Sequence, residues 1–190
     1  MGQHRFVWDL RYESPPGVQR SFDIAAVYRN TPSGPPGPFV HPGRYVVRLT
    51  ADNIVREQTI EVRLDPRVTI SDSDLRLQTR YSLATLRGQQ QAQAIRDKID
   101  ANLSGVGEGQ RDRLLALRGA GNAENPDISY GSISASPSHL ETIVSIQTKL
   151  TYMLKILQSA DARPTDQAMQ SVDALLATLD ELEQRHTDLQ

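Results

Sequence analysis

The stretch that decides the fold opens the chain: His4-Arg5-Phe6-Val7-Trp8-Asp9-Leu10-Arg11-Tyr12. It alternates apolar and polar residues and contains aromatic and β-branched types, which is typical of a half-buried strand. Some thirty residues later Pro42-Gly43 forms a turn, and Arg44–Leu49 repeats the alternation. We therefore expect a chain that starts inside a β structure. We also expect it to be the C-terminal end of a larger protein, with any reactive part elsewhere.

Residues 1–68 carry the strand signals. The Pro/Gly-rich run 31–38 excludes a helix or a ladder there, and Asp52-Asn53 is typical of a hairpin turn. Four strands with one apolar face cannot close a sandwich core, and an Ig-like sandwich has about seven strands. The sequence therefore predicts a partial Ig-like antiparallel β-sandwich, incomplete at its N-terminus. The four expected strands are Phe6–Tyr12, Phe22–Tyr28, Gly43–Ala51 and Ile54–Leu64.

Residues 69–190 show the three- and four-residue spacing of amphipathic helices, which predicts an antiparallel three-helix bundle and an α+β protein in two segments. Gly88 lies in the first stripe, where it indicates either a close approach of another backbone or simple tolerance. The first stripe is Leu77, Tyr81, Ala84, Gly88, Ala92, Ile95, Ile99 and Leu103. The second is Leu140, Ile143, Ile146, Leu150, Met153, Leu154 and Leu157. The third is Val172, Leu175, Leu179, Leu182, His186 and Leu189.

Helix starts are marked by capping residues. Ser71 with Asp74 and Ser138 with Glu141 resemble capping boxes, and Thr165 is the expected N-cap of the last helix. Between the first two helices, 104–137 is rich in Gly, Asn and Ser, which predicts a flexible connection. A short amphipathic piece, Arg111–Arg118, lies within it.

The composition argues against nucleic-acid binding, a membrane span and cysteine chemistry. The 21 Lys and Arg nearly balance 23 Asp and Glu, so no basic surface is expected for a nucleic acid. No apolar run approaches the ~20 residues of a membrane span. The chain has no cysteine, which excludes disulfides, thiolate metal sites and cysteine nucleophiles.

No set of residues predicts catalysis, a cofactor or a metal. The histidines His4, His41, His139 and His186 are far apart, although His4 and His41 could meet across the sheet. Gly105-Val106-Gly107-Glu108-Gly109 follows a helix rather than a strand, so it is not a dinucleotide-binding loop. Acidic pairs such as Asp72 and Asp74 are typical of helix N-termini, where negative charge stabilises the helix dipole, so they do not indicate acid–base catalysis. We therefore expect this chain not to be an enzyme.

Five aromatic residues of the β half allow two interpretations. If Trp8, Tyr12, Tyr28, Phe39 and Tyr45 are exposed and coplanar, they would form a platform on which sugar rings stack. If Trp8 and Tyr45 fill the sandwich core, no such platform exists, and alternation favours this reading. A carbohydrate-binding module is therefore the alternative function.

Three stretches carry a resemblance to a known family: residues 4–12, residues 37–49 and residues 62–68. They resemble the C-terminal region of large bacterial exported proteins with BNR-type, sortilin-like β-propellers, often labelled glycosyl hydrolases. Trp8-Asp9 followed by Pro42-Gly43-Arg44-Tyr45-Val46-Val47 also resembles the Ig-like domain of flagellar hook-capping proteins. In the propeller family a helical segment follows the sandwich, and Leu157–Leu182 is similar to it.

The resemblance implies a non-catalytic accessory module that caps or orients an upstream propeller or mediates assembly. It also implies export to the periplasm or the cell exterior, and it assigns no catalytic residue to this chain. An unpaired edge at Phe6–Tyr12 would add a tendency to self-associate.

Overall fold

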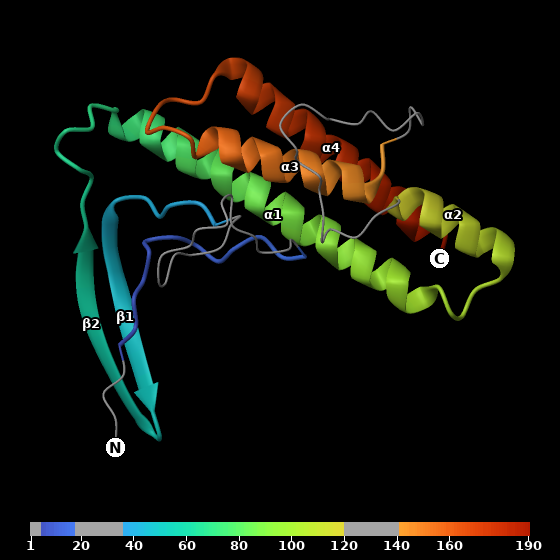
Figure 1. Cartoon of the computed structure of the whole chain (residues 1–190), viewed down its shortest axis with the longest axis horizontal. Coiled ribbons are helices and arrows are strands. Elements are labelled where there is room, and N and C mark those ends of the chain that lie inside the picture. The colour runs from blue at the N-terminus through green and yellow to red at the C-terminus, as the bar shows by residue number, and fades with distance from the viewer. Residues whose placement is uncertain (1–4, 18–35, 120–140) are drawn as a thin grey trace, which may run out of the picture.

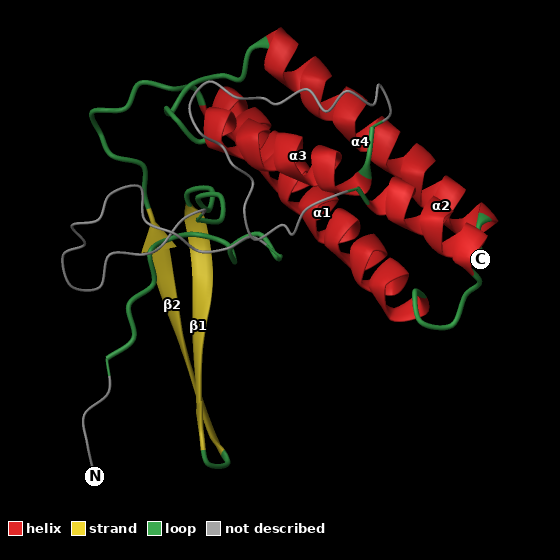
Figure 2. Ribbon diagram, turned by 45° about the vertical axis from the view of Figure 1, so that its right-hand side comes forward, coloured by secondary structure: helices red, strands yellow, loops and turns green. Residues whose placement is uncertain are grey.

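The structure, a computed structural model, describes residues 5–17, 36–119 and 141–190. These residues form an α+β protein in which a two-stranded antiparallel sheet projects from a group of four helices (Figure 1). In chain order the elements are β1 (Gly43–Ala51), β2 (Ile54–Val62), α1 (Asp72–Asn102), α2 (Glu108–Arg118), α3 (Ile143–Leu157) and α4 (Asp166–Asp188). The β1–β2 hairpin extends away from the helices in both ribbon views (Figures 1 and 2).

The helices share a main apolar core, and a smaller buried cluster of Met153, Leu157 and Val172 joins α3 to α4. α1 and α4 run in the same direction, and α3 runs back against both of them (Figure 1). The short helix α2 adds Leu114 and Leu117 to the core, so four helices build it where the sequence predicts three. The fully or nearly fully buried core residues are Ala92, Ile95, Ile99, Leu114, Leu117, Ile143, Ile146, Leu150, Leu179 and Leu182.

The predicted apolar stripes of α3 and α4 are confirmed. Every predicted α3 position from Ile143 to Leu157 is buried, while Leu140 lies outside the described residues. In α4, Leu175 and Leu189 are half-buried and the other four predicted positions are buried. Spacing at three and four residues places these side chains on one face of each helix, which explains why the sequence alone could identify them.

In α1 the predicted stripe is buried only from Gly88 to Ile99, and Leu103, which caps the helix, is half-buried. Closer to the N-terminus, Leu77, Tyr81 and Ala84 are half-buried rather than buried. Most of the residues that are buried in this part of the helix are polar, which the apolar stripe could not reveal. The buried polar residues are Gln78, Ser82, Thr85 and Gln89, and the buried apolar ones are Leu75 and Leu86.

The space beside Gly88 is filled by side chains and not by another backbone. A Cβ at this position would lie 2.5 Å from Leu176 Cδ2 and 2.9 Å from Leu150 Cδ1. Both distances are shorter than van der Waals contact, so an alanine would force the leucines to shift. Glycine therefore lets the two leucines pack closely against α1, at a cost in helix propensity of about 1 kcal/mol.

Two of the three predicted N-caps are confirmed. The Ser71 hydroxyl accepts a hydrogen bond from Asp74 N at 3.1 Å, and Thr165 accepts one from Ala168 N at 3.1 Å. α3 begins later than expected, because Thr142 is its N-cap and forms a capping box with Ser145. The predicted cap Ser138 lies outside the described residues.

The predicted hairpin is confirmed almost to its ends. β1 has the expected bounds and β2 ends two residues early, at Val62. Ala51 pairs with Ile54, so Asp52-Asn53 is the two-residue turn, and Asp52 has the positive φ of 48° that such turns require.

The predicted strand Phe6–Tyr12 is wrong. Within it only Arg11 forms a β-bridge, with Phe39, and Leu10 has a φ of 61° that breaks an extended chain. Trp8 Nε1 donates to Arg11 O at 3.0 Å, which folds the segment back on itself. The predicted strand Phe22–Tyr28 lies outside the described residues, so the described sheet has two strands.

The β arm, defined here as residues 5–17 and 36–62, rests on α3 and on its C-terminal cap residue through hydrogen bonds. Phe39 N donates to Gln158 Oε1 at 2.8 Å, and Gln147 Nε2 donates to Pro16 O at 3.3 Å. Backbone groups outside helices and sheets need hydrogen-bond partners, and the amide side chains of Gln147 and Gln158 supply them here. These contacts set the base from which the hairpin projects.

Candidate functional site

The two faces of the hairpin differ sharply in chemistry. The register pairs Tyr45 with Ile60, Val47 with Gln58, Leu49 with Arg56 and Ala51 with Ile54. Directly opposed residues of an antiparallel pair share a face, so these eight residues form one surface, called here the apolar face. The other face, called here the polar face, carries Arg44 opposite Glu61, Val46 opposite Thr59, Arg48 opposite Glu57 and Thr50 opposite Val55.

The apolar face is largely exposed. Val47 is 44% exposed, Leu49 63% and Ile54 59%. A sheet with this alternation normally buries its apolar face on a second layer. The described residues cover only the base of this face, where the Trp8 ring meets the Tyr45 ring edge-on at 5.4 Å between centroids.

Exposed apolar side chains are concentrated in the β arm. Ten of the thirteen large hydrophobic side chains that are exposed in the described residues lie between Phe6 and Val55, and only three lie on the helices. A contiguous exposed apolar surface marks an interaction site more often than scattered residues do. The β arm is therefore the candidate functional site of this chain.

The polar face is held by ion pairs. Arg48 Nε lies 2.7 Å from Glu57 Oε1 across the hairpin, and Arg63, just past the end of β2, places its Nη2 2.7 Å from Glu61 Oε2. The hydrogen bond from Arg63 lowers the pKa of Glu61. Both pairs are exposed, so each contributes little to stability, but together they fix where charge lies on this face.

The five candidate ligand-binding aromatics do not form one flat surface in the described residues. The Trp8 and Tyr45 rings meet at 64°, and the Arg11 guanidinium lies 3.5 Å from the centroid of the Phe39 ring. Tyr12 is 39% exposed and Phe39 45%. Tyr28 lies outside the described residues. Sugar binding by these residues stays a prediction.

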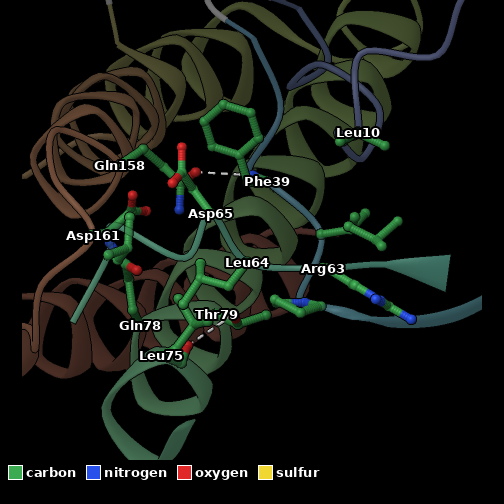
Figure 3. Close-up of a pocket in the computed structure, with 14 residues that line it drawn as sticks. Leu10, Phe39, Arg63, Leu64, Asp65, Leu75, Gln78, Thr79, Gln158 and Asp161 are labelled. Atoms are coloured by element: carbon green, nitrogen blue, oxygen red, sulfur yellow. Dashed lines mark hydrogen bonds between the residues drawn. The ribbon is translucent and has the colours of Figure 1, made fainter. Parts of the chain in front are cut away.

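A small cavity lies where the base of the hairpin meets the helices (Figure 3). Its volume is about 210 Å³, below the ~300 Å³ at which organic ligands are usually held. Phe39, Leu64 and Leu75 form its apolar walls. Gln78 of α1 and Gln158, which follows α3, add amide groups to the lining. Gln78 Nε2 already donates to Leu157 O and Ala160 O, so this amide is engaged in structure rather than directed at a ligand.

The opposite end of the helices has a second cavity, of about 410 Å³, beside His186. Burial lowers the pKa of His186 below its usual value of 6.5, and the positive charge of Lys98 adds to this. The Gln190 amide approaches His186 Nε2 at 3.3 Å as a donor to the neutral ring.

His186 should make stability pH-dependent. Because its pKa is lower in the folded chain than in the unfolded one, the unfolded chain binds more protons below pH 6.5. The free energy of unfolding should therefore fall as pH drops below 6.5. Urea unfolding of the protein and of His186→Gln at a series of pH values measures this. The prediction is wrong if both proteins lose the same stability on acidification.

Of the four histidines the structure describes two, His41 and His186, so the possible meeting of His4 and His41 stays a prediction. His41 Nε2 lies 3.4 Å from Asp72 Oδ1 at the start of α1, while His4 and His139 lie outside the described residues. Within residues 5–17, 36–119 and 141–190 no three potential metal ligands are grouped. No helix in the part of the chain that the structure describes is long and apolar enough to cross a membrane.

Sequence reasoning missed a polar seam between α1 and α3. Arg96 is 5% exposed, and its Nη1 donates to Gln147 Oε1 at 2.8 Å and to Gln93 Oε1 at 3.2 Å. Thr151 Oγ1 donates to Gln89 Oε1 at 2.8 Å. The sequence of α1 does contain a pattern that indicates this seam, because polar residues recur at helical spacing beside the apolar stripe. The seam comprises Gln78, Ser82, Thr85, Gln89, Gln93, Arg96, Gln147, Thr151 and Gln158.

Comparison with known proteins adds no relative. No family model matches the chain, and no curated protein or solved structure is significantly similar to it. Its function is therefore argued from the geometry of the β arm together with the sequence resemblance given above.

Proposed function

We propose that this chain is a non-catalytic accessory module that attaches to a larger exported β-propeller protein through its β arm. The single observation that carries the proposal is the exposed apolar face of the hairpin, with Val47, Leu49 and Ile54 each at least 44% exposed. In this proposal the helices are the rigid base, and the hairpin is the part that enters a larger β structure.

The geometry supports docking of a sheet better than docking of a small ligand. A two-stranded hairpin is marginally stable by itself, and a further layer over its apolar face would stabilise it. A nine-residue strand is ~30 Å long, so the apolar face offers an elongated surface suited to other strands. Such a layer would complete the Ig-like sandwich that the sequence predicts, with the helical bundle as its appendage.

Site-specific photo-crosslinking tests the proposal. The photoreactive residue p-benzoylphenylalanine replaces Leu49 on the apolar face, and cells that make the protein are irradiated. We expect the crosslinked peptide to come from a β-strand of a propeller or sandwich region. The matched control places the same residue at Arg48, the neighbouring position on the polar face, where we expect much less crosslinking.

Two results would contradict the proposal. One is equal crosslinking from Leu49 and Arg48, which would mean that the apolar face has no dedicated partner. The other is a Leu49 crosslink only to the helices of this chain, which would mean that the face is covered internally.

A further inference from the structure

His41 connects the base of the hairpin to the first turn of α1. It precedes β1 by two residues, and its side chain is only 17% exposed. Its Nε2 lies 3.4 Å from Asp72 Oδ1, but within the described residues this buried nitrogen makes no hydrogen bond. Buried polar atoms nearly always have a hydrogen-bond partner, so this exception needs an explanation. The two atoms are close enough for an ion pair and do not yet form a hydrogen bond.

The other ring nitrogen determines what Nε2 can do. His41 Nδ1 lies 2.7 Å from Pro42 O, and a carbonyl oxygen only accepts, so Nδ1 carries a proton. In the neutral ring Nε2 then holds a lone pair that faces the Asp72 carboxylate, which is unfavourable because both groups are acceptors. In the protonated ring Nε2 carries a proton that it can donate to the carboxylate. Protonation therefore replaces an unfavourable contact with a charge-assisted hydrogen bond.

The groups around His41 keep their own charge while a histidine ring titrates, which occurs between pH 5 and pH 8. The hydrogen bond from Arg76 lowers the pKa of Asp72, so its carboxylate is ionised over this range. The Tyr45 hydroxyl donates to His41 O, and burial raises the pKa of Tyr45, so this hydrogen bond persists. His41 is therefore the group of this contact that changes charge.

A second contact beside His41 reports whether the base of the β arm is attached. Phe39 N donates to Gln158 Oε1 at 2.8 Å, and Gln158 Nε2 donates to Ser82 Oγ at 2.9 Å. The base is thus attached to α1 through His41 and to the end of α3 through Phe39. Only the buried Val40 separates these two residues in the chain, so a stronger contact at one should also hold the other.

We propose that His41 is a pH-dependent latch, which fixes the base of the hairpin on α1 through Asp72 when its ring is protonated and loosens it when the ring is neutral. The latch governs how firmly the apolar face is presented to a partner. This consequence rests on the proposed function, whereas the latch itself concerns only the contact between the β arm and the helices.

Hydrogen exchange of the Phe39 amide in the full chain tests the latch. The protection factor compares the measured rate with the intrinsic rate at the same pH, so catalysis of exchange by hydroxide cancels. Because the Asp72 side chain is 67% exposed, the ion pair is weak, and we expect the protection factor to be about threefold higher at pH 5 than at pH 8. His186 cannot cause this rise, since its protonation lowers the free energy of unfolding.

Three variants assign the effect to this contact. His41→Gln and Asp72→Asn should each lose the rise in Phe39 protection at pH 5. Asp74→Asn is the matched control, because it removes a carboxylate from the same turn of α1, one that pairs with Arg163 instead. This control should keep the rise. Far-UV circular dichroism confirms that the helices are intact in all three.

Several results would overturn the latch. One is a Phe39 protection factor that stays constant between pH 5 and pH 8 or falls on acidification. Another is a rise that persists in Asp72→Asn or disappears in Asp74→Asn. If any of these occurs while Leu49 still crosslinks to a propeller or sandwich strand, the proposed function stands and only the latch is wrong. If the pH dependence holds and the Leu49 crosslink is absent, the latch stands and the proposed function is wrong.

Discussion

Replacing Leu150 by alanine is expected to lower the free energy of unfolding by about 3–4 kcal/mol. Leu150 is fully buried at the centre of the core, and its Cδ1 lies within 2.9 Å of the place where a Gly88 side chain would begin. Removing its three outer carbons leaves a cavity between α1, α3 and α4 that rigid helices cannot close. Urea unfolding followed by far-UV circular dichroism measures the loss.

Ile156→Ala is the matched control for this change. Ile156 lies on the same helix but is 41% exposed, so its removal should cost much less than that of Leu150. Equal losses in the two variants would show that α3 does not hold the core together.

Replacing Gln147 by leucine is expected to cost about 2–3 kcal/mol, although leucine is similar in size. Gln147 Oε1 is the nearest hydrogen-bond acceptor of the buried Arg96 guanidinium, at 2.8 Å. Arg96 Nε has no acceptor among the described residues, so the guanidinium is already incompletely paired. Burial lowers the pKa of Arg96, which shows that its surroundings disfavour the charge. Without Gln147 the charge keeps only Gln93 as a side-chain acceptor.

The double variant Gln147→Leu/Arg96→Met distinguishes loss of pairing from loss of packing. Once the charge is gone, no buried donor is left unpaired by the leucine, so the double variant should be more stable than Gln147→Leu alone. A double-mutant cycle by urea unfolding measures the coupling. If the two single losses simply add, Arg96 and Gln147 are not coupled and the explanation is wrong. Hydrogen exchange near Pro16, which accepts from Gln147, should also rise in Gln147→Leu.

Local sequence patterns predict the elements whose structure depends on residues that are close together in the chain. The hairpin follows from alternation and from the Asp52-Asn53 turn, which together fix the pairing of every residue in β1 and β2. The buried positions of α3 and α4 follow from spacing at three and four residues, and Thr165 follows from the need to satisfy free amides at a helix start.

Part of the candidate site was predictable in the same way. Alternation predicts one apolar face for each expected strand, and in the hairpin the structure places Ile60 of the return strand on the apolar face with Tyr45. The exposure of that face was not predictable, because alternation indicates a preference for burial and does not reveal which second layer, if any, lies above it.

Local sequence patterns are sufficient to predict the hairpin, its two faces and the apolar stripes of α3 and α4, because each depends on residues a few positions apart. Long-range packing determines that Phe6–Tyr12 is not a strand: its backbone pairs with residues 38–40 only around the Arg11–Phe39 bridge, and the positive φ of Leu10 interrupts the extended chain. It also decided that the buried face of α1 near Gln78 is polar. There α1 lies against the end of α3. Gln78 donates a hydrogen bond to Leu157 O, and Gln158 accepts one from the Phe39 backbone in the β arm. These partners are far apart in the sequence, so no local pattern predicts the contacts.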